Sequence, residues 1–301
     1  MQPGATTAAP PGWAILIPGF RPARLAGAGL ILSVLLPPGP RTFIALLAII
    51  VLGVPHGALD GELARTALRP RFGHAWFAVF SLPYLLVTGS VLLAWHWAPI
   101  PTLAAFLAAS AWHFGTEETG SLAPLEILAV GGLPIAMAVL AHPAATAMIF
   151  GTVSQTLMTY PPIWLEDSAL LWAGLAVIHT VRLFRAGRPH QLGRSALLAA
   201  LFVALPPLSA FAIYFVCIHA PAHIRGLVQD SRCAPRIRDD ASAFQLALPV
   251  TLLTLLLGAG LWPLYAGPSD QRLLCLTIQG LAALTLPHML FELWLSRRLG
   301  L

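Results

Sequence analysis

Long apolar runs recur from one end of the chain to the other, and they constrain its fold more than any other feature. Most approach the ~20 residues that an α-helix needs to cross the hydrocarbon core of a bilayer. The chain is 57% hydrophobic and 10% charged, whereas a soluble domain is about 25% charged. We therefore expect an all-α, polytopic transmembrane helical bundle. Nine apolar runs are recognised, at residues 22–36 (short), 42–58, 76–97, 101–116, 124–142, 168–184, 195–224 (too long for one span), 243–265 and 272–293.

No shift in composition divides the chain, so we expect one transmembrane helical domain over residues 21–301. A flexible tail is expected over residues 1–20, because it is rich in proline and glycine. The tail lacks the basic region of a cleavable signal, so we expect no cleavage.

All the basic residues are arginines, and they lie in short loops between the apolar runs. This placement favours anchoring at the cytoplasmic face of a membrane over nucleic-acid binding. The three cysteines are scattered, without a CxxC pair, so neither a disulfide framework nor a zinc site is expected: Cys217, Cys233 and Cys275.

Five of the ten histidines occur in polar motifs near the ends of apolar runs. In three motifs a carboxylate follows the histidine at i,i+4, which places both on one helix face. A fourth motif places two histidines at i,i+4, a spacing that can present two nitrogens to one metal. The motifs are PHGALD (His56, Asp60), WHFGTEE (His113, Glu117), CIHAPAH (His219, His223) and PHMLFE (His288, Glu292). The other histidines lack such neighbours, and we expect no catalytic role for them: His74, His96, His142, His179 and His190.

A metal site explains why imidazoles and carboxylates would be paired inside apolar segments. A neutral imidazole binds a transition metal through one nitrogen, while a carboxylate on the other nitrogen fixes the tautomer and the ring orientation. Ionisable groups within membrane spans usually pair or serve a function. The alternative is that each histidine–carboxylate pair is an interfacial ion pair.

The motifs can meet only if the chain crosses the membrane once more between Glu118 and His219. The pair Pro206-Pro207 is the expected break, dividing the run 195–224 into two helices and giving ten segments. With this split, fifteen arginines lie on one side and two, Arg41 and Arg272, on the other. A crossing at 144–160 is the alternative, with a weaker charge bias. We expect the metal site toward the cytoplasmic leaflet.

Imidazoles without thiolates suit iron, copper, zinc or nickel. Four imidazoles could leave adjacent positions open on an octahedral iron, where dioxygen could bind beside a hydrophobic substrate. Nearby aromatic residues could line an apolar cleft: Trp112, Phe114, Phe211, Tyr214 and Phe215.

From about residue 42 to 293 the motifs PHGALD, AWHFGTEE, FAIYFVCIHAPAH and LPHMLFE resemble the Brp/Blh family of bacterial and archaeal membrane proteins. The resemblance implies an enzyme that cleaves β-carotene with O2 at its central double bond to give two molecules of retinal. It implies a non-haem ferrous iron (Fe2+) held by four histidines, with four further side chains around them. The implied ligands are His56, His113, His219 and His223, and the outer residues are Asp60, Glu117, His288 and Glu292. A related carotenoid as substrate, and an opsin that accepts the retinal, are further implications, in a multi-pass protein of the plasma (inner) membrane.

One motif departs from the family pattern, because the segment between His219 and His223 is APA instead of a polar, often basic sequence. Pro221 removes one helical hydrogen bond and predicts a kink between the two histidines.

Two other classes of protein remain open. A di-iron desaturase or hydroxylase also uses membrane histidines, but in several clusters, and this chain has one HxxxH pair. A haem-binding or metal-transporting bundle would use facing histidines without catalysis.

Overall fold

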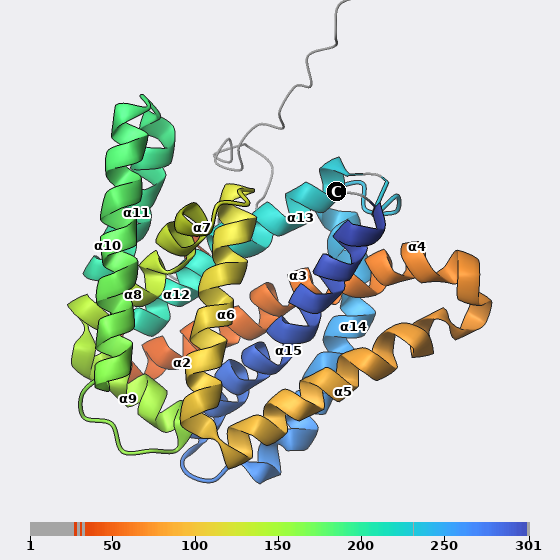
Figure 1. Ribbon diagram of the computed structural model, residues 1–301. Coiled ribbons are helices and arrows are strands. Elements are labelled where there is room, and N and C mark those ends of the chain that lie inside the picture. Colours follow the sequence, from red (N-terminus) through yellow and green to blue (C-terminus); the bar gives the residue numbers. More distant parts are fainter. Residues whose placement is uncertain (1–26, 29–30, 32–33, 231, 300–301) are drawn as a thin grey trace, which may run out of the picture.

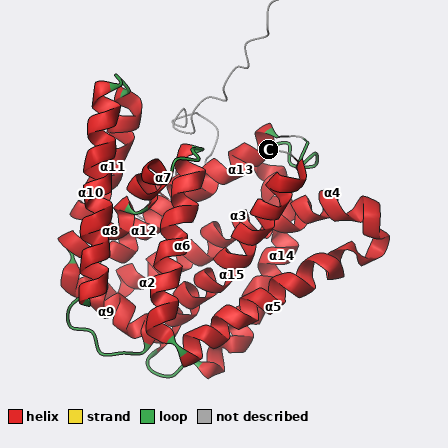
Figure 2. Ribbon diagram, viewed as in Figure 1, coloured by secondary structure: helices red, strands yellow, loops and turns green. Residues whose placement is uncertain are grey.

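The computed structural model describes residues 27–28, 31, 34–230 and 232–299. Within these ranges the chain is helical, with short loops and no strand (Figure 2). The predicted all-α bundle is therefore confirmed. The tail predicted at 1–20, and most of the first apolar run at 22–36, lie outside the described residues.

The helices follow one another with few intervening residues, and most loops are shorter than five residues. In chain order the elements are α2 (Pro38–Ala48), the π-turn η1 (Ile49–Gly53), α3 (Val54–Ala58), α4 (Asp60–Phe72), the 3-10 turn η2 (Gly73–Ala75), α5 (Trp76–Trp97), α6 (Pro99–Thr119), α7 (Pro124–Gly131), α8 (Leu133–Ala141), α9 (Pro143–Ser154), α10 (Ile163–Arg185), α11 (Pro189–Ala204), α12 (Pro207–Tyr214), the π-turn η3 (Phe215–His219), α13 (Ala220–Gln229), α14 (Asp240–Leu261), the 3-10 turn η4 (Trp262–Leu264) and α15 (Ser269–Leu299).

The predicted break at Pro206-Pro207 is present. Helix α11 ends at Ala204, and α12 begins at Pro207 with Pro206 as its N-cap. Figure 1 shows α10 and α11 as a hairpin whose tip lies at the same end of the molecule as the α13–α14 loop. The chain therefore makes the additional reversal between α6 and α13 that the histidine motifs require.

Five helical stretches of the described chain are long and apolar enough to cross a membrane, and the pair α7–α8, bent by 41°, adds a sixth when counted as one span. The first stretch, Pro38–Trp97, contains both predicted runs 42–58 and 76–97, because α4 and η2 join them without a long loop. Its direction reverses at Gly73, whose φ of +54° favours glycine. The chain is thus a multi-pass membrane protein, with fewer spans by these criteria than the nine or ten segments expected.

Glycine contacts bring α6 and α7 unusually close together. A Cβ built on Gly115 would overlap the carbonyl oxygen of Ile127, and a Cβ on Gly131 would overlap the carbonyl oxygen of Ala111. Small residues at helix interfaces let membrane helices pack backbone to backbone. This packing fixes the position of the half of α6 that carries His113.

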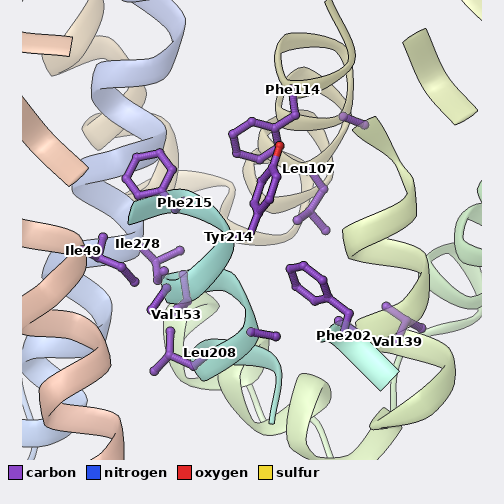
Figure 3. Close-up of a cluster of buried hydrophobic side chains, with 14 of the residues drawn as sticks. Ile49, Leu107, Phe114, Val139, Val153, Phe202, Leu208, Tyr214, Phe215 and Ile278 are labelled. Atoms are coloured by element: carbon purple, nitrogen blue, oxygen red, sulfur yellow. The ribbon is translucent and has the colours of Figure 1, made fainter. Parts of the chain in front are cut away.

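The main apolar core lies between α6, α8, α11, α12 and the central helices α2 and α15. Figure 3 shows Phe114, Tyr214 and Phe202 on one side of this core and Phe215 with Ile49 on the other. Packing in this core holds α12 and the π-turn η3 between α6 and η1. The histidine motifs on these elements therefore lie close to each other.

Candidate metal centre

Five histidine side chains from five different elements meet inside the bundle. They are His56 (α3), His113 (α6), His219 (η3), His223 (α13) and His288 (α15). Six pairs of their rings have centroids 5.2–6.0 Å apart. Each residue is at most 7% exposed. The structure thus brings together all four histidines predicted as ligands, and His288 joins them.

Two π-turns position three of these histidines. The turn η1 precedes Pro55-His56, and η3 ends at His219, two residues before Pro221. A proline cannot donate the next helical hydrogen bond, and the wider π-turn absorbs the break. Pro221 consequently lies in the first turn of α13, where proline is tolerated. The kink predicted at the APA segment is therefore taken up by η3.

The two π-turns also touch each other. A Cβ built on Gly53 would overlap the ring of Phe215, so glycine is needed at this contact. The Phe215 ring stacks on His219 at 5.7 Å and meets His56 edge-on at 5.2 Å. The close approach of η1 and η3 therefore brings the His56 and His219 rings to 5.4 Å.

The carboxylates pair with histidines of other helices, which differs from the predicted i,i+4 pairing for two of the three motifs. His288 Nδ1 donates to Asp60 Oδ2 at 2.8 Å, and His223 Nδ1 donates to Glu117 Oε2 at 3.2 Å. His56 Nδ1 donates instead to the carbonyl of Gly53. Asp60 lies one turn after His56 and lines the same cavity, but its carboxylate is used by His288 of α15 and not by His56.

Glu292 lies between two histidines. Its Oε2 is 3.5 Å from His288 Nε2, as the i,i+4 spacing predicted, and its Oε1 is 3.7 Å from His223 Nδ1. Two groups of side chains have ligand atoms within 4.8 Å of one another: His113, His288 and Glu292, and Glu117, His223 and Glu292.

The buried nitrogen atoms fit a metal ion. Within the described structure, Nε2 of His219, His223 and His288 is buried without a hydrogen-bond partner. Buried polar atoms are nearly always satisfied, so several unsatisfied imidazole nitrogens in one cluster require an explanation. A first-row transition metal accepts this set of imidazoles and carboxylates. The site can therefore hold such a metal ion.

An apolar cavity of about 600 Å³ opens onto the histidine cluster. His56, His113 and His288 line it, together with side chains from α5, α6, α8, α9, α11, α12, α14 and α15. Of the aromatic residues proposed for the cleft, Phe114, Phe211 and Phe215 line this cavity. Trp112 and Tyr214 are not among the lining residues, since Trp112 is 41% exposed and Tyr214 is buried in the core.

Sequence reasoning missed two groups of residues near the site. Tyr84 on α5 lines the cavity, and its hydroxyl lies 3.3 Å from Asp60 Oδ2. Glu118 pairs with Arg194 of α11 and accepts a hydrogen bond from Tyr214 at 3.4 Å. No spacing rule connects residues so distant in sequence. However, a carboxylate and an arginine inside apolar segments usually pair, so Glu118 and Arg194 were open to prediction as an ion pair.

The fold and the site define the class of protein: a multi-pass helical membrane protein with a buried histidine–carboxylate centre that faces an apolar cavity. Residues 47–296 match the family model described as beta-carotene 15,15'-dioxygenase. The chain therefore belongs to this family of carotenoid dioxygenases.

Two curated relatives cover most of the chain. One is the probable beta-carotene 15,15'-dioxygenase Blh of Halobacterium salinarum (strain ATCC 700922 / JCM 11081 / NRC-1), which is 29% identical over 94% of this chain and 92% of its own length. The other is the beta-carotene 15,15'-dioxygenase of uncultured marine bacterium 66A03, 27% identical over 82% of this chain and 90% of its own length. No solved structure gave a significant match.

Proposed function

We propose that this chain is a membrane-bound non-haem iron dioxygenase that cleaves β-carotene, or a related carotenoid, with O2. The central double bond breaks, and each of its two carbons receives one oxygen atom, so one β-carotene and one O2 give two molecules of retinal. The observation that carries the proposal is the cluster of buried imidazoles with unpaired nitrogens on the wall of an apolar cavity. The family of the chain supports the same reaction.

His56, His113, His219 and His223 are the proposed ligands of the iron. Ferrous iron supplies the redox chemistry that lets O2 react with an alkene. Asp60, through His288, and Glu117, through His223, orient imidazoles from outside the ligand set. Glu292 stands between His223 and His288 and limits the rotation of both.

The apolar residues around the cluster keep water away from the reacting bond and bind the polyene. Phe114 lies 4.9 Å from the His219 ring, and Phe215 covers the opposite region between His219 and His56. These rings also prevent the imidazoles from turning toward other partners. A rigid, dry site of this kind holds a long apolar substrate through packing and not through hydrogen bonds.

The proposed location is the plasma (inner) membrane, with the metal site toward the cytoplasmic leaflet. The loops that carry fifteen of the seventeen arginines lie on one side in the ten-segment topology, which the positive-inside rule assigns to the cytoplasm. A retinal-accepting opsin is the proposed recipient of the product.

The test is the metal content of the purified protein. We expect about one iron per chain, and loss of both iron and activity when His56, His113, His219 or His223 is replaced by Ala. His179→Ala is the matched control, because His179 is also buried but lies in α10 outside the cluster. Two irons per chain, or full activity of His113→Ala, would contradict the four-histidine site.

A haem-binding bundle is distinguished by the absorption spectrum. A haem protein would show an intense Soret band after purification, and the proposed enzyme would show none.

A further inference from the structure

The walls of the histidine cavity differ on its two sides. On the side of α6, α8, α11 and α12 the lining includes side chains that are almost fully buried, such as Leu107, Phe202 and Leu208. On the side of α5 and α14 the lining includes Leu85, which is 47% exposed, and Leu257, which is 50% exposed. The cavity is therefore closed toward α6 and α12 and open between α5 and α14.

The opening is formed by one face of each helix. On α5 the lining residues Phe77, Ser81 and Leu85 follow one another at i,i+4. On α14 the lining residues Thr254 and Leu257, with Gly258, also share one face. Helix α5 packs mainly against α15 and α4, whereas α14 packs mainly against α3. The two lining faces consequently border the cavity without packing closely on each other.

The opening lies at the depth of the bilayer. The stretch Asp240–Leu264, which contains α14, is apolar enough to span a membrane, and only 11% of its most apolar window is buried inside the protein. The stretch Pro38–Trp97, which contains α5, is also apolar enough to span. An opening between these two helices therefore communicates with lipid, where carotenoids dissolve.

We propose that the carotenoid enters sideways from the bilayer between α5 and α14, end first, and that its leading half occupies the closed part of the cavity beyond the histidines. This inference rests on the proposed function. A long polyene can reach the cluster through an open side only by threading past His288 and His56 toward α6. The depth of the closed part then determines which double bond of the polyene stops beside the cluster. The residues that line the closed part therefore determine the position of cleavage.

Two glycines of α14 provide a matched test. Gly258 lines the cavity, Gly260 does not, and a Cβ added at either position meets no atom within 4 Å. Gly258→Trp places a large ring in the proposed entrance, and Gly260→Trp places the same ring on the same helix toward lipid. Neither substitution touches a proposed iron ligand, so both variants should retain iron.

The first measurement is uptake of β-carotene from liposomes by metal-free protein, followed through the carotenoid absorption. We expect Gly258→Trp to slow uptake by about tenfold or more, Gly258→Leu to slow it less, and Gly260→Trp to change it less than twofold. Equal uptake by all four proteins, with both tryptophan variants folded by size-exclusion chromatography, would overturn the entrance.

The second measurement is steady-state cleavage by the iron-loaded proteins. We expect kcat/KM for β-carotene to fall in Gly258→Trp in parallel with uptake and to remain within twofold in Gly260→Trp. Absence of cleavage by the unmodified, iron-loaded protein would refute the proposed function, whereas the uptake measurement would still decide the entrance. Full cleavage by Gly258→Trp would overturn the entrance alone.

Discussion

At the scale of single residues, three imidazoles of the cluster have their Nδ1 atom held by a fixed acceptor. His56 uses the carbonyl of Gly53, His223 uses Glu117, and His288 uses Asp60. An imidazole whose Nδ1–H is a donor presents the lone pair of Nε2. The acceptors therefore fix which nitrogen of each ring carries the proton and leave Nε2 free to accept, as the outer partners of metal-bound histidines do.

Replacing Glu117 tests this orientation. Glu117→Ala leaves His223 Nδ1 without its acceptor, and we expect iron retention against a graded series of chelator concentrations to weaken by roughly 10–100-fold. Glu117→Gln keeps an acceptor oxygen at the same place, and most of the retention should return. If Glu117→Ala removes the iron as completely as His223→Ala does, the carboxylate is a direct ligand.

At the scale of elements, breaks in helices place the histidines. The π-turns η1 and η3 redirect the chain beside Pro55 and Pro221. Periodicity predicted the helices and the prolines predicted irregularity, but the i,i+4 rule considers only partners on one helix. The pairing of Asp60 with His288 could not be predicted, because it depends on the relative position of α4 and α15. The pairing of Glu117 with His223 likewise depends on the relative position of α6 and α13.

The contact between α6 and α7 gives a prediction on stability. Gly131→Ala places a methyl group against the carbonyl oxygen of Ala111, and overpacking of this kind destabilises by about 1–3 kcal/mol. Thermal unfolding in one detergent, monitored by size-exclusion chromatography, measures the difference in melting temperature from the unmodified protein.

Gly174→Ala is the matched control for this prediction. Gly174 lies in α10, and a Cβ there meets no atom within 4 Å. Gly174→Ala should leave the melting temperature unchanged or raise it slightly, because alanine is a better helix former than glycine. An unchanged melting temperature of Gly131→Ala would show that the helices can separate without loss of stability.

At the scale of the whole molecule, the sequence predicts the fold class, the break at Pro206 and the convergence of the histidine motifs. These follow from apolar length, arginine distribution and the requirement that one site collect all the motifs. The number of spans was less predictable. Helix α9, with 12 residues, is apolar without reaching spanning length, and α11, with 16 residues, is also too short and begins with polar residues.

Topology can be tested with Cys233, which lies in the α13–α14 loop. A membrane-impermeant thiol reagent should leave Cys233 unmodified in intact cells and label it in inverted vesicles. Burial, and the hydrogen bond that the thiol donates to Asp230, raise the pKa of Cys233, so labelling needs mildly alkaline buffer. A cysteine introduced at Thr66 in α4 should behave like Cys233.

The control is Ser269→Cys, at the exposed start of α15 on the opposite side of the predicted topology. It should be labelled in intact cells. Opposite labelling of Cys233 and Thr66→Cys would place His219 and His56 near opposite faces of the membrane, roughly 30 Å apart. No single iron could then bind both.

The products formed from β-carotene test the central claim most directly. Purified, iron-loaded protein is incubated with β-carotene in air, and the products are separated by chromatography, with His56→Ala as the inactive control. We predict two molecules of retinal for each β-carotene consumed and no other aldehyde. Intact β-carotene in the presence of folded, iron-loaded protein, or pairs of aldehydes of unequal length, would contradict central cleavage at this site.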